Sequence, residues 1–201
     1  HADLGVAPSI LWSLPGHQLT YYVERTFDTW TDRSIAKERL KRFLFGRAAA
    51  FLTPGPDADS YLHQYAVSQR KIHRLEHVID VGHFHHAAAL RSSLGATSRR
   101  LQVGLTGVVF LYVGRIGWEK GLTTLLDAYA EVRSRRPGCS LLIVGDGEER
   151  DRYMASVRER RIPGVVFLDF VQQASLPEIY SLGDVFGCPT RGDPYGLVVD
   201  E

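Results

Sequence analysis

The sequence predicts an α/β fold with parallel sheets, because apolar runs typical of strands alternate with helical patterns along most of the chain. The alternation is clearest from residue 108 onward, where every connection is short, and this pattern is half of a doubly wound fold. Residues 1–82 alternate in the same way. Residues 83–107 are rich in Ala, Ser, Arg and Gly without a β period, which predicts a short helix and a linker between two domains.

The composition is that of an ordinary globular protein and argues against several classes. Of 201 residues, 44% are hydrophobic, and 24 Lys and Arg against 23 Asp and Glu give a net charge of +1, so nothing favours a nucleic-acid partner. No apolar run reaches the roughly 18–20 residues of a membrane span. The two cysteines, Cys139 and Cys188, are too few for a disulfide framework, and we expect both to be small core residues.

The two ends of the sequence indicate a piece of a longer protein. The chain begins at His1 without an initiator Met or a visible signal peptide, and it stops at Glu201 within a helical pattern. We therefore expect both domains to be incomplete.

Short strands and two helices are expected in the first part. The expected strands are residues 9–14, 19–23, 48–52 and 72–75, and the expected helices are 57–65 and a helix capped by Thr31 or Asp32 that runs to about Gly46. The first helix carries a basic cluster: Lys37, Arg39, Lys41, Arg42 and Arg47. Such a face could contact an anionic membrane surface, but more often it is simply solvated.

One histidine cluster stands out, His83, His85 and His86, after an extended segment 77–81. A metal site needs three or four converging ligands with supporting hydrogen bonds, and no Cys or paired carboxylate lies nearby at a suitable spacing. We expect a surface loop here and no metal site.

The second part predicts four strands and the helices between them. The expected strands are residues 108–113, 140–144, 165–168 and 185–188. The first helix presents one apolar face: Leu122, Leu125, Leu126, Tyr129 and Val132. Residues 148–160 form the next helix, a capping-box pattern at Ser175–Glu178 starts a short one, and Gly196 opens the last.

The loop after the first of these strands indicates an anion site. Two glycines, Gly114 and Gly121, enclose two cations, Arg115 and Lys120, between a strand and a helix. A helix N-terminus at the carboxyl end of a parallel strand already favours an anion, and the two cations add full charge there. The sequence therefore predicts a phosphate or pyrophosphate ligand, against the alternative of a surface loop with solvated cations.

Two further loops meet the same edge of the predicted sheet, residues 145–147 and 191–196. The last one carries Asp193, and Glu201 follows eight residues later, two turns into the expected helix. Carboxylates at two depths suit a ligand with hydroxyl groups at both ends, and the backbone N–H groups of Gly196 and Leu197 face the same place. This order of groups matches ribose, pyrophosphate and sugar in a nucleotide sugar.

Three stretches resemble one known family. The segments Val109-Phe-Leu-Tyr-Val-Gly-Arg-Ile-x-x-Glu-Lys-Gly, Leu141-Leu-Ile-Val-Gly-Asp-Gly and Asp193-Pro-Tyr-Gly-Leu-Val-Val-Asp-Glu201 are similar to glycosyltransferase family 4. That family has the GT-B fold, in which two Rossmann-like doubly wound domains face each other. The resemblance is strong over residues 108–201 and weak before them.

The resemblance implies a role for each matching residue. Arg115 and Lys120 would bind the donor diphosphate, Asp193 the hydroxyls of the transferred sugar and Glu201 the ribose; Arg115, Lys120 and Asp193 form the implied catalytic set. The implied donor-binding residues are Gly114, Arg115, Lys120, Gly145, Val171, Gly192, Asp193, Tyr195, Gly196, Leu197 and Glu201. Val171 would lie beside the base, and residues 192–197 would supply backbone amides. No metal ligand is implied.

The resemblance also implies the domain organisation. Residues 1–82 would be the C-terminal portion of the acceptor-side domain, residues 83–107 the linker, and residues 108–201 the donor-binding domain, truncated at its end. The sequence departs from the family at Asp193, where the signature has Glu, so the contact with the sugar is expected to differ. The family's glycine-rich acceptor loop is absent from the sequence.

The implied activity is transfer of a sugar from a nucleotide-sugar donor to a saccharide or lipid-linked acceptor with retention of configuration, without a cofactor or a metal. We expect a cytoplasmic enzyme of polysaccharide, glycolipid or glycoconjugate synthesis, in contact with the inner membrane face at most peripherally, and we expect the chain by itself to be inactive. One alternative is a non-catalytic module that binds nucleotide sugars. The other is an NAD-dependent Rossmann oxidoreductase, for which Gly145-Asp-Gly147 is weak evidence, because Arg150 stands where the fingerprint needs a third glycine.

Overall fold

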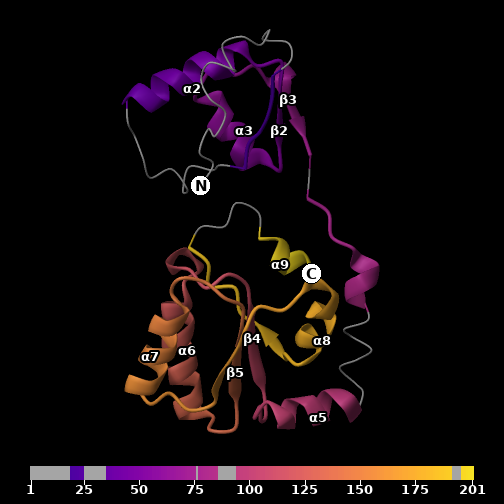
Figure 1. The fold of residues 1–201 in the computed structure, drawn as a ribbon, viewed down its shortest axis with the longest axis vertical. Helices are drawn as coiled ribbons and strands as arrows, with labels where there is room; N and C mark the ends of the chain where they lie inside the picture. Colours follow the sequence, from indigo (N-terminus) through magenta and orange to yellow (C-terminus); the bar gives the residue numbers. More distant parts are fainter. Residues whose placement is uncertain (1–18, 25–34, 76, 86–93, 192–195) are drawn as a thin grey trace. The chain divides into compact units, whose positions relative to one another are not determined.

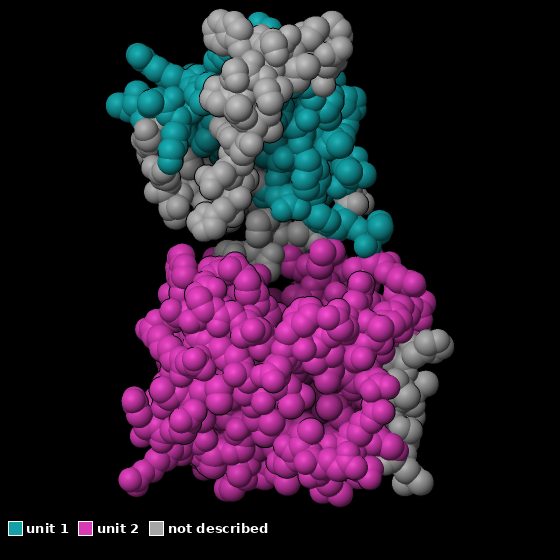
Figure 2. Space-filling view, in the orientation of Figure 1, with its two compact units in different colours: residues 1–78 teal, residues 79–201 magenta. Residues whose placement is uncertain are grey.

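The structure, a computed structural model, describes residues 19–24, 35–75, 77–85, 94–191 and 196–201 (Figure 1). The chain divides into two compact units, residues 1–78 and residues 79–201 (Figure 2). The expected strand at residues 9–14, the helix caps at Thr31 and Asp32, and His86 lie outside the described residues.

Unit 1 contains a parallel three-stranded sheet in the order β1-β2-β3, with Phe51 of β2 in register with Tyr21 and Ile72 on its two sides. Its strands are β1 (Thr20–Tyr22), β2 (Ala50–Thr53) and β3 (Ile72–Arg74), and its helices are α2 (Ile35–Arg47), α3 (Pro56–His63) and the 3₁₀ helix η3 (Gln69–Lys71). The core buries Phe45 of α2 and Tyr61 of α3 against Phe51. The predicted alternation of strand and helix is therefore present.

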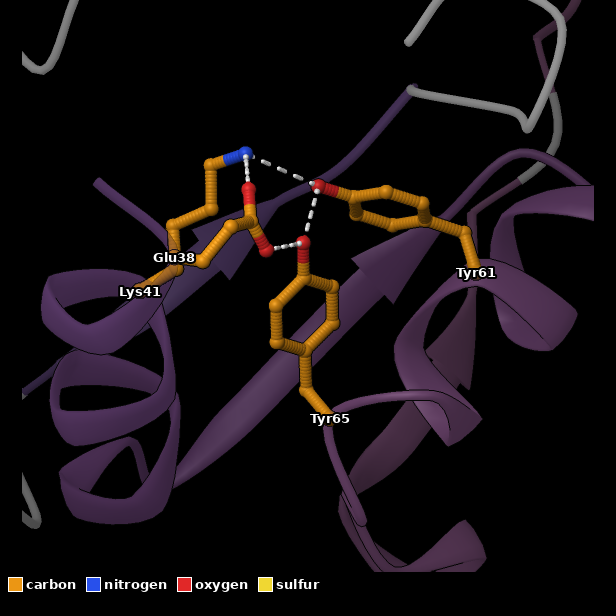
Figure 3. Close-up of polar contacts among 4 residues, drawn as sticks. All are labelled: Glu38, Lys41, Tyr61 and Tyr65. Carbon is orange, nitrogen blue, oxygen red and sulfur yellow. Dashed lines mark hydrogen bonds and ion pairs between the residues drawn. The ribbon is translucent and has the colours of Figure 1, made fainter. Parts of the chain in front are cut away.

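A ring of polar contacts ties α2 to α3 and the residues after it (Figure 3). Tyr65 donates a hydrogen bond of 2.6 Å to Glu38, and Lys41 donates bonds of 2.9 Å to Glu38 and 3.4 Å to the Tyr61 hydroxyl. Burial, followed by the hydrogen bond to Glu38, raises the pKa of Tyr65 above its ordinary value. Lys41 is therefore turned toward the protein, with 17% of its side chain exposed, and it does not belong to the solvated basic face that the sequence predicts.

Unit 2 contains a four-stranded sheet in the order β6-β5-β4-β7, in which every pairing is parallel. Its strands are β4 (Val109–Val113), β5 (Ser140–Val144), β6 (Val165–Leu168) and β7 (Val185–Phe186). Its helices include α5 (Leu94–Gln102), α6 (Leu122–Arg135), α7 (Arg150–Glu159), α8 (Leu176–Ser181) and α9 (Leu197–Asp200), with the 3₁₀ helices η4 (Trp118–Lys120) and η5 (Gln173–Ser175). Along the chain, β5 and β6 are added to the sheet on one side of β4, and β7 is then added on its other side. The switch point of this doubly wound order therefore lies beside β4.

The sheet of unit 2 separates two layers of helices (Figure 1). Leu141 and Ile143 of β5 pack in one buried cluster with the apolar face of α6 and with Tyr153 of α7. Leu142 and Val144 of β5 pack in a second cluster, which includes side chains of α8. The strand is buried on both faces, as its continuous apolar run predicts.

Three local predictions from the sequence differ from the structure. Ser175 makes no side-chain capping bond, because η5 runs directly into α8 and leaves Ser175 with a helical backbone; the Glu178 carboxylate pairs with Arg99 of α5 instead of returning to the helix start. Cys188 is exposed, because β7 ends at Phe186, before it reaches Cys188. Residues 81–85 are helical, where an extended end and a surface loop were expected.

The segment expected as a linker is attached to unit 2. Arg100 of α5 forms an ion pair of 3.0 Å with Asp184, and the other oxygen of that carboxylate accepts a 2.8 Å hydrogen bond from the Val109 backbone N–H. Leu105 is buried in the second cluster of unit 2. The roles assigned to residues 1–82 and 108–201 stay predictions.

The carboxyl ends of the strands in unit 2 approach one another so closely that they require glycine. A Cβ atom at Gly145 would lie 2.0 Å from the Gly114 carbonyl oxygen, and φ of Gly145 is +140°. A Cβ atom at Gly121 would lie 2.1 Å from the Pro189 carbonyl oxygen, and φ there is +70°. Both neighbours are backbone atoms, so they cannot move aside as a flexible side chain can.

We expect Gly145→Ala to lower the free energy of unfolding by roughly 2–4 kcal/mol, because the methyl group would overlap the Gly114 carbonyl in a backbone region that disfavours side chains. Gly138→Ala is the matched control, since a Cβ atom there meets nothing within 4 Å. Urea unfolding of the chain measures both. Equal effects of the two substitutions would contradict the close approach.

The buried hydroxyl of Tyr129 is expected to make the stability of unit 2 depend on pH in the alkaline range. Its hydroxyl lies 3.1 Å from the Cys139 carbonyl oxygen, 3.1 Å from that of Pro163 and 3.2 Å from that of Gly164. Burial, followed by electrostatic interaction with Cys139, raises the pKa of Tyr129 to about 12. The unfolded chain loses this proton near pH 10 while the folded chain keeps it, so the contribution of Tyr129 to stability falls between about pH 10 and 12.

We expect Tyr129→Phe to be less stable than wild type by about 1–2 kcal/mol at pH 8, because the variant leaves buried carbonyl groups without this donor. The difference between the two proteins should shrink as the pH rises from about 10 to 12, since only wild type carries the titrating group. Urea unfolding at a series of pH values measures it. A difference that stays constant across that range would contradict the raised pKa.

Candidate functional site

The loop after β4 is built from short-range contacts that fix its backbone. Gly114 leaves the strand with φ of +151°, and η4 follows and ends at Gly121, which is left-handed and caps α6. The Tyr112 hydroxyl donates a 2.8 Å hydrogen bond to the Arg115 carbonyl oxygen. The strand, cationic loop and helix predicted from the sequence are therefore present in that order.

Backbone hydrogen bonds join this loop to the loops after β5 and β7. The Ile116 N–H donates to the Asp146 carbonyl oxygen at 2.8 Å, and the Arg191 N–H donates to the Glu119 carbonyl oxygen at 2.8 Å. The loops after β4, β5 and β7 thus meet at one edge of the sheet. Ligands of open α/β sheets bind at such an edge, beside the switch point.

Arg115 lies at this edge with its side chain 60% exposed and forms ion pairs with two carboxylates. Glu119, one turn further along the loop, accepts a hydrogen bond from the guanidinium, and Glu148 lies 3.9 Å from it. Both acids offset part of the positive charge that the sequence predicts. The guanidinium has five N–H donors, so a carboxylate contact does not use up its capacity to bind.

Lys120 is half-buried at the last position of η4, directly before Gly121. Its backbone N–H donates a 3.1 Å hydrogen bond to the Gly117 carbonyl oxygen, which fixes the position of its Cα atom. The two predicted cations therefore flank one short, hydrogen-bonded turn.

Glu201, the predicted ribose ligand, follows α9 and contacts α8. Its carboxylate accepts a 2.5 Å hydrogen bond from the Tyr180 hydroxyl. Burial, followed by this hydrogen bond, raises the pKa of Tyr180 above its ordinary value, so the phenol is neutral and remains a donor at physiological pH. Gly196 caps α9 in the left-handed conformation, and Leu197 is the first residue of this helix.

The remaining predicted site residues are placed in part. Gly114 and Gly145 lie at the carboxyl edge, in the close contact described above. Val171 follows β6 and packs against the second buried cluster of unit 2. Gly192, Asp193 and Tyr195 lie outside the described residues, so the predicted contact of Asp193 with the sugar stays a prediction.

Three residues of the site had no predicted role, namely Glu119, Glu148 and Tyr180. Glu119 stands inside the motif of the loop, and its spacing of four residues from Arg115 is the signal that could have identified the ion pair. Tyr180 lies 21 residues before Glu201, and no periodicity connects the two. Only the fold, which brings Glu201 to α8, reveals that contact.

Within the described ranges, no group of three or more His, Cys, Asp or Glu side chains is placed to hold a metal ion. In the same part of the chain, no helix has both the length and the apolar character needed to cross a membrane.

The sequence is similar to several bacterial transferases. It is 26% identical to the alpha-D-kanosaminyltransferase of Streptomyces kanamyceticus over 204 residues, covering 98% of this chain and 50% of the relative. It is 30% identical to the D-inositol 3-phosphate glycosyltransferase of Segniliparus rotundus over 152 residues, covering 72% of this chain and 32% of the relative. The chain thus spans about half the length of the first relative and about a third of the second.

Solved structures show the same fold. The crystal structure of Anabaena HepE in complex with UDP-glucose matches with a TM-score of 0.71 at 19% identity, covering 90% of this chain and 49% of HepE. Sucrose-phosphate synthase from Thermosynechococcus elongatus matches with a TM-score of 0.63 at 23% identity, covering 83% of this chain and 41% of the synthase. These similarities confirm the predicted fold class, α/β of the GT-B type with incomplete Rossmann-like parts.

The sequence pattern of one family, Glycosyl transferases group 1, matches residues 97–201. This range contains the loop with Arg115 and Lys120, the contact between Tyr180 and Glu201, and the whole sheet of unit 2. Because the match covers more than half of the chain, the chain belongs to the glycosyl transferases group 1 family.

Proposed function

We propose that the whole protein transfers a sugar from a nucleotide-sugar donor to an acceptor with retention of configuration. The observation that carries the proposal is the meeting of three strand-end loops at the switch point of unit 2, with Arg115 and Lys120 on the first of them. Family membership supports the reaction class. The nucleotide sugar bound by HepE, a protein of the same fold, supports the class of donor.

In this proposal Lys120 is the principal ligand of the donor diphosphate. Lys120 lies half-buried on this turn, where the dielectric constant is lower than in bulk water and a charge acts more strongly. Glu201 binds the ribose, Asp193 the hydroxyls of the sugar, and the backbone beside Val171 the base. The resemblance to glycosyltransferase family 4 is the basis for these three assignments.

The proposed chemistry is stabilisation of a departing diphosphate. As the bond between sugar and phosphate breaks, positive charge grows on the sugar ring and negative charge grows on the leaving group. A hydrogen-bonded turn holds the backbone of Arg115 and Lys120 before the reaction begins, so the loop itself does not have to rearrange for these cations to stabilise that charge. No metal or cofactor enters the proposed step.

We assign unit 1 to the acceptor side and a saccharide or a lipid-linked sugar as the acceptor. Contact with an anionic membrane surface through α2 also stays a prediction. Three apolar side chains of this helix are exposed beside its basic residues, namely Ile35, Leu40 and Phe43.

We expect Lys120→Ala in the whole protein to lower the rate of sugar transfer by about 10²–10³-fold, because a charge that stabilises the leaving diphosphate is lost. Arg135→Ala is the matched control, since it removes the same charge from an exposed side chain at the far end of α6. Transfer is measured with UDP-, GDP- and ADP-sugars, and thermal unfolding checks the fold of each variant. Normal turnover by Lys120→Ala would contradict the diphosphate site.

The same assays separate the proposed function from its alternatives. A product with inverted configuration at the anomeric carbon would reject the retaining mechanism. Saturable binding of a nucleotide sugar without transfer to any saccharide or lipid-linked acceptor would favour a non-catalytic binding module. Binding of NADH in preference to nucleotide sugars would favour the oxidoreductase.

A further inference from the structure

Three aromatic side chains form a row inside unit 2, and Tyr180 of α8 is its centre. The rings of Tyr180 and Phe84 are edge-to-face with centroids 5.8 Å apart, and the ring of Phe186 lies 6.1 Å from Tyr180 on β7. Phe84 is 6% exposed. The ring of Tyr180 is therefore held by the first residues of unit 2 and by an edge strand of its sheet.

The residues around Phe84 are themselves anchored. The Asp80 carboxylate accepts a 3.1 Å hydrogen bond from the His83 backbone N–H, and the His83 imidazole is 3.1 Å from the Gln173 carbonyl oxygen of η5. This places Phe84 firmly against α8. The packing of these rings therefore sets the position of the Tyr180 ring and of its hydroxyl oxygen.

That hydroxyl reaches Glu201 across 21 residues of sequence. It donates to Oε2 at 2.5 Å, and Oε1 of the same carboxylate makes no hydrogen bond to a residue that the structure describes. Glu201 is the residue directly after the four-residue helix α9, at its C-terminal cap. A long side chain at such a position gains a defined direction mainly from a partner outside its own helix.

We propose that Tyr180 is a positioning residue for the donor: it binds one carboxylate oxygen of Glu201 and so presents the other to a ribose hydroxyl. The inference rests on the proposed function and deepens it, because it names the group that sets the specificity for ribose. The raised pKa of Tyr180 agrees with this role, since the phenol keeps its proton, and hence its bond to Glu201, throughout the physiological range.

Removal of the Tyr180 hydroxyl should weaken donor binding and leave the rate of the chemical step nearly unchanged. The ribose lies at the far side of the diphosphate from the bond that breaks, so its contact contributes equally before and in the transition state. Removal of such a contact raises KM and leaves kcat nearly unchanged. A loss of general stability would have no such selectivity.

The test uses Tyr180→Phe in the whole protein, because this substitution keeps the aromatic row and removes only the hydroxyl. We expect the donor KM, and the Kd of the nucleoside diphosphate, to rise about tenfold, as expected for the loss of one hydrogen bond to a charged group. We expect kcat to change by less than about threefold. Binding is measured with UDP, GDP and ADP and with their 2′-deoxy and 2′,3′-dideoxy counterparts.

Tyr129→Phe is the matched control, since it removes a buried tyrosine hydroxyl elsewhere in the same unit. It should lower stability without raising the Kd of the diphosphate. In wild type, loss of the ribose hydroxyls should weaken binding, and in Tyr180→Phe this penalty should shrink. Glu201→Ala should raise the Kd at least as much as Tyr180→Phe, and the double variant should resemble Glu201→Ala alone.

Each outcome is decisive. An unchanged Kd in Tyr180→Phe, an equal rise in Tyr129→Phe, or additive effects of Tyr180→Phe and Glu201→Ala would overturn the positioning role while the proposed function stands. Failure of wild type to bind any of the ribonucleoside diphosphates or to transfer a sugar would overturn the proposed function, and the positioning role with it. Weaker binding that depends on both the ribose hydroxyls and Glu201 would support both.

Discussion

The parallel pairing of β4 with β5 on one side and with β7 on the other is the constraint on which unit 2 depends. It brings loops that are distant in sequence to the same edge, where backbone touches backbone at Gly145 and Gly121. Because glycine removes the side chains from these contacts, peptide groups of neighbouring loops lie against one another at the edge that also carries Arg115 and Lys120. Peptide N–H groups and cations together are the chemistry that proteins use to bind phosphates.

Most of this architecture could be predicted from the sequence because its strands are unambiguous. Residues 165–168 were predicted as a strand, and β6 has those bounds; the apolar run at 140–144 likewise became β5. One prediction failed because a distant partner decided the outcome. The capping box at Ser175 lost its acid to Arg99, a residue on a separate helix, and a pattern within four residues cannot anticipate that pairing.

In the candidate site, too, the local features could be predicted from the sequence and the contacts between distant residues could not. Arg115 and Lys120 could be assigned to one loop, because their glycine neighbours and the strand before them are local features. The contact of Glu148 with Arg115 and the bond between Tyr180 and Glu201 depend on how loops and helices pack. The sequence contains these residues, but only the fold brings Tyr180 to Glu201 and Glu148 to Arg115. The contribution of Asp193 stays a prediction.

The pairing of Arg115 bears on how the proposed site would accept a diphosphate. The contact with Glu148, at 3.9 Å and on a guanidinium that is 60% exposed, contributes at most about 1 kcal/mol, so a phosphate can replace it with little loss. Glu119 is less exposed, at 20%, and belongs to the same turn, so its hydrogen bond can persist while the ligand binds. The five donors of a guanidinium allow both contacts at once. Glu119 would then orient Arg115 toward the donor, as Tyr180 orients Glu201: at both ends of the proposed ligand, a charged group is held in place by a neighbour that does not touch the ligand itself.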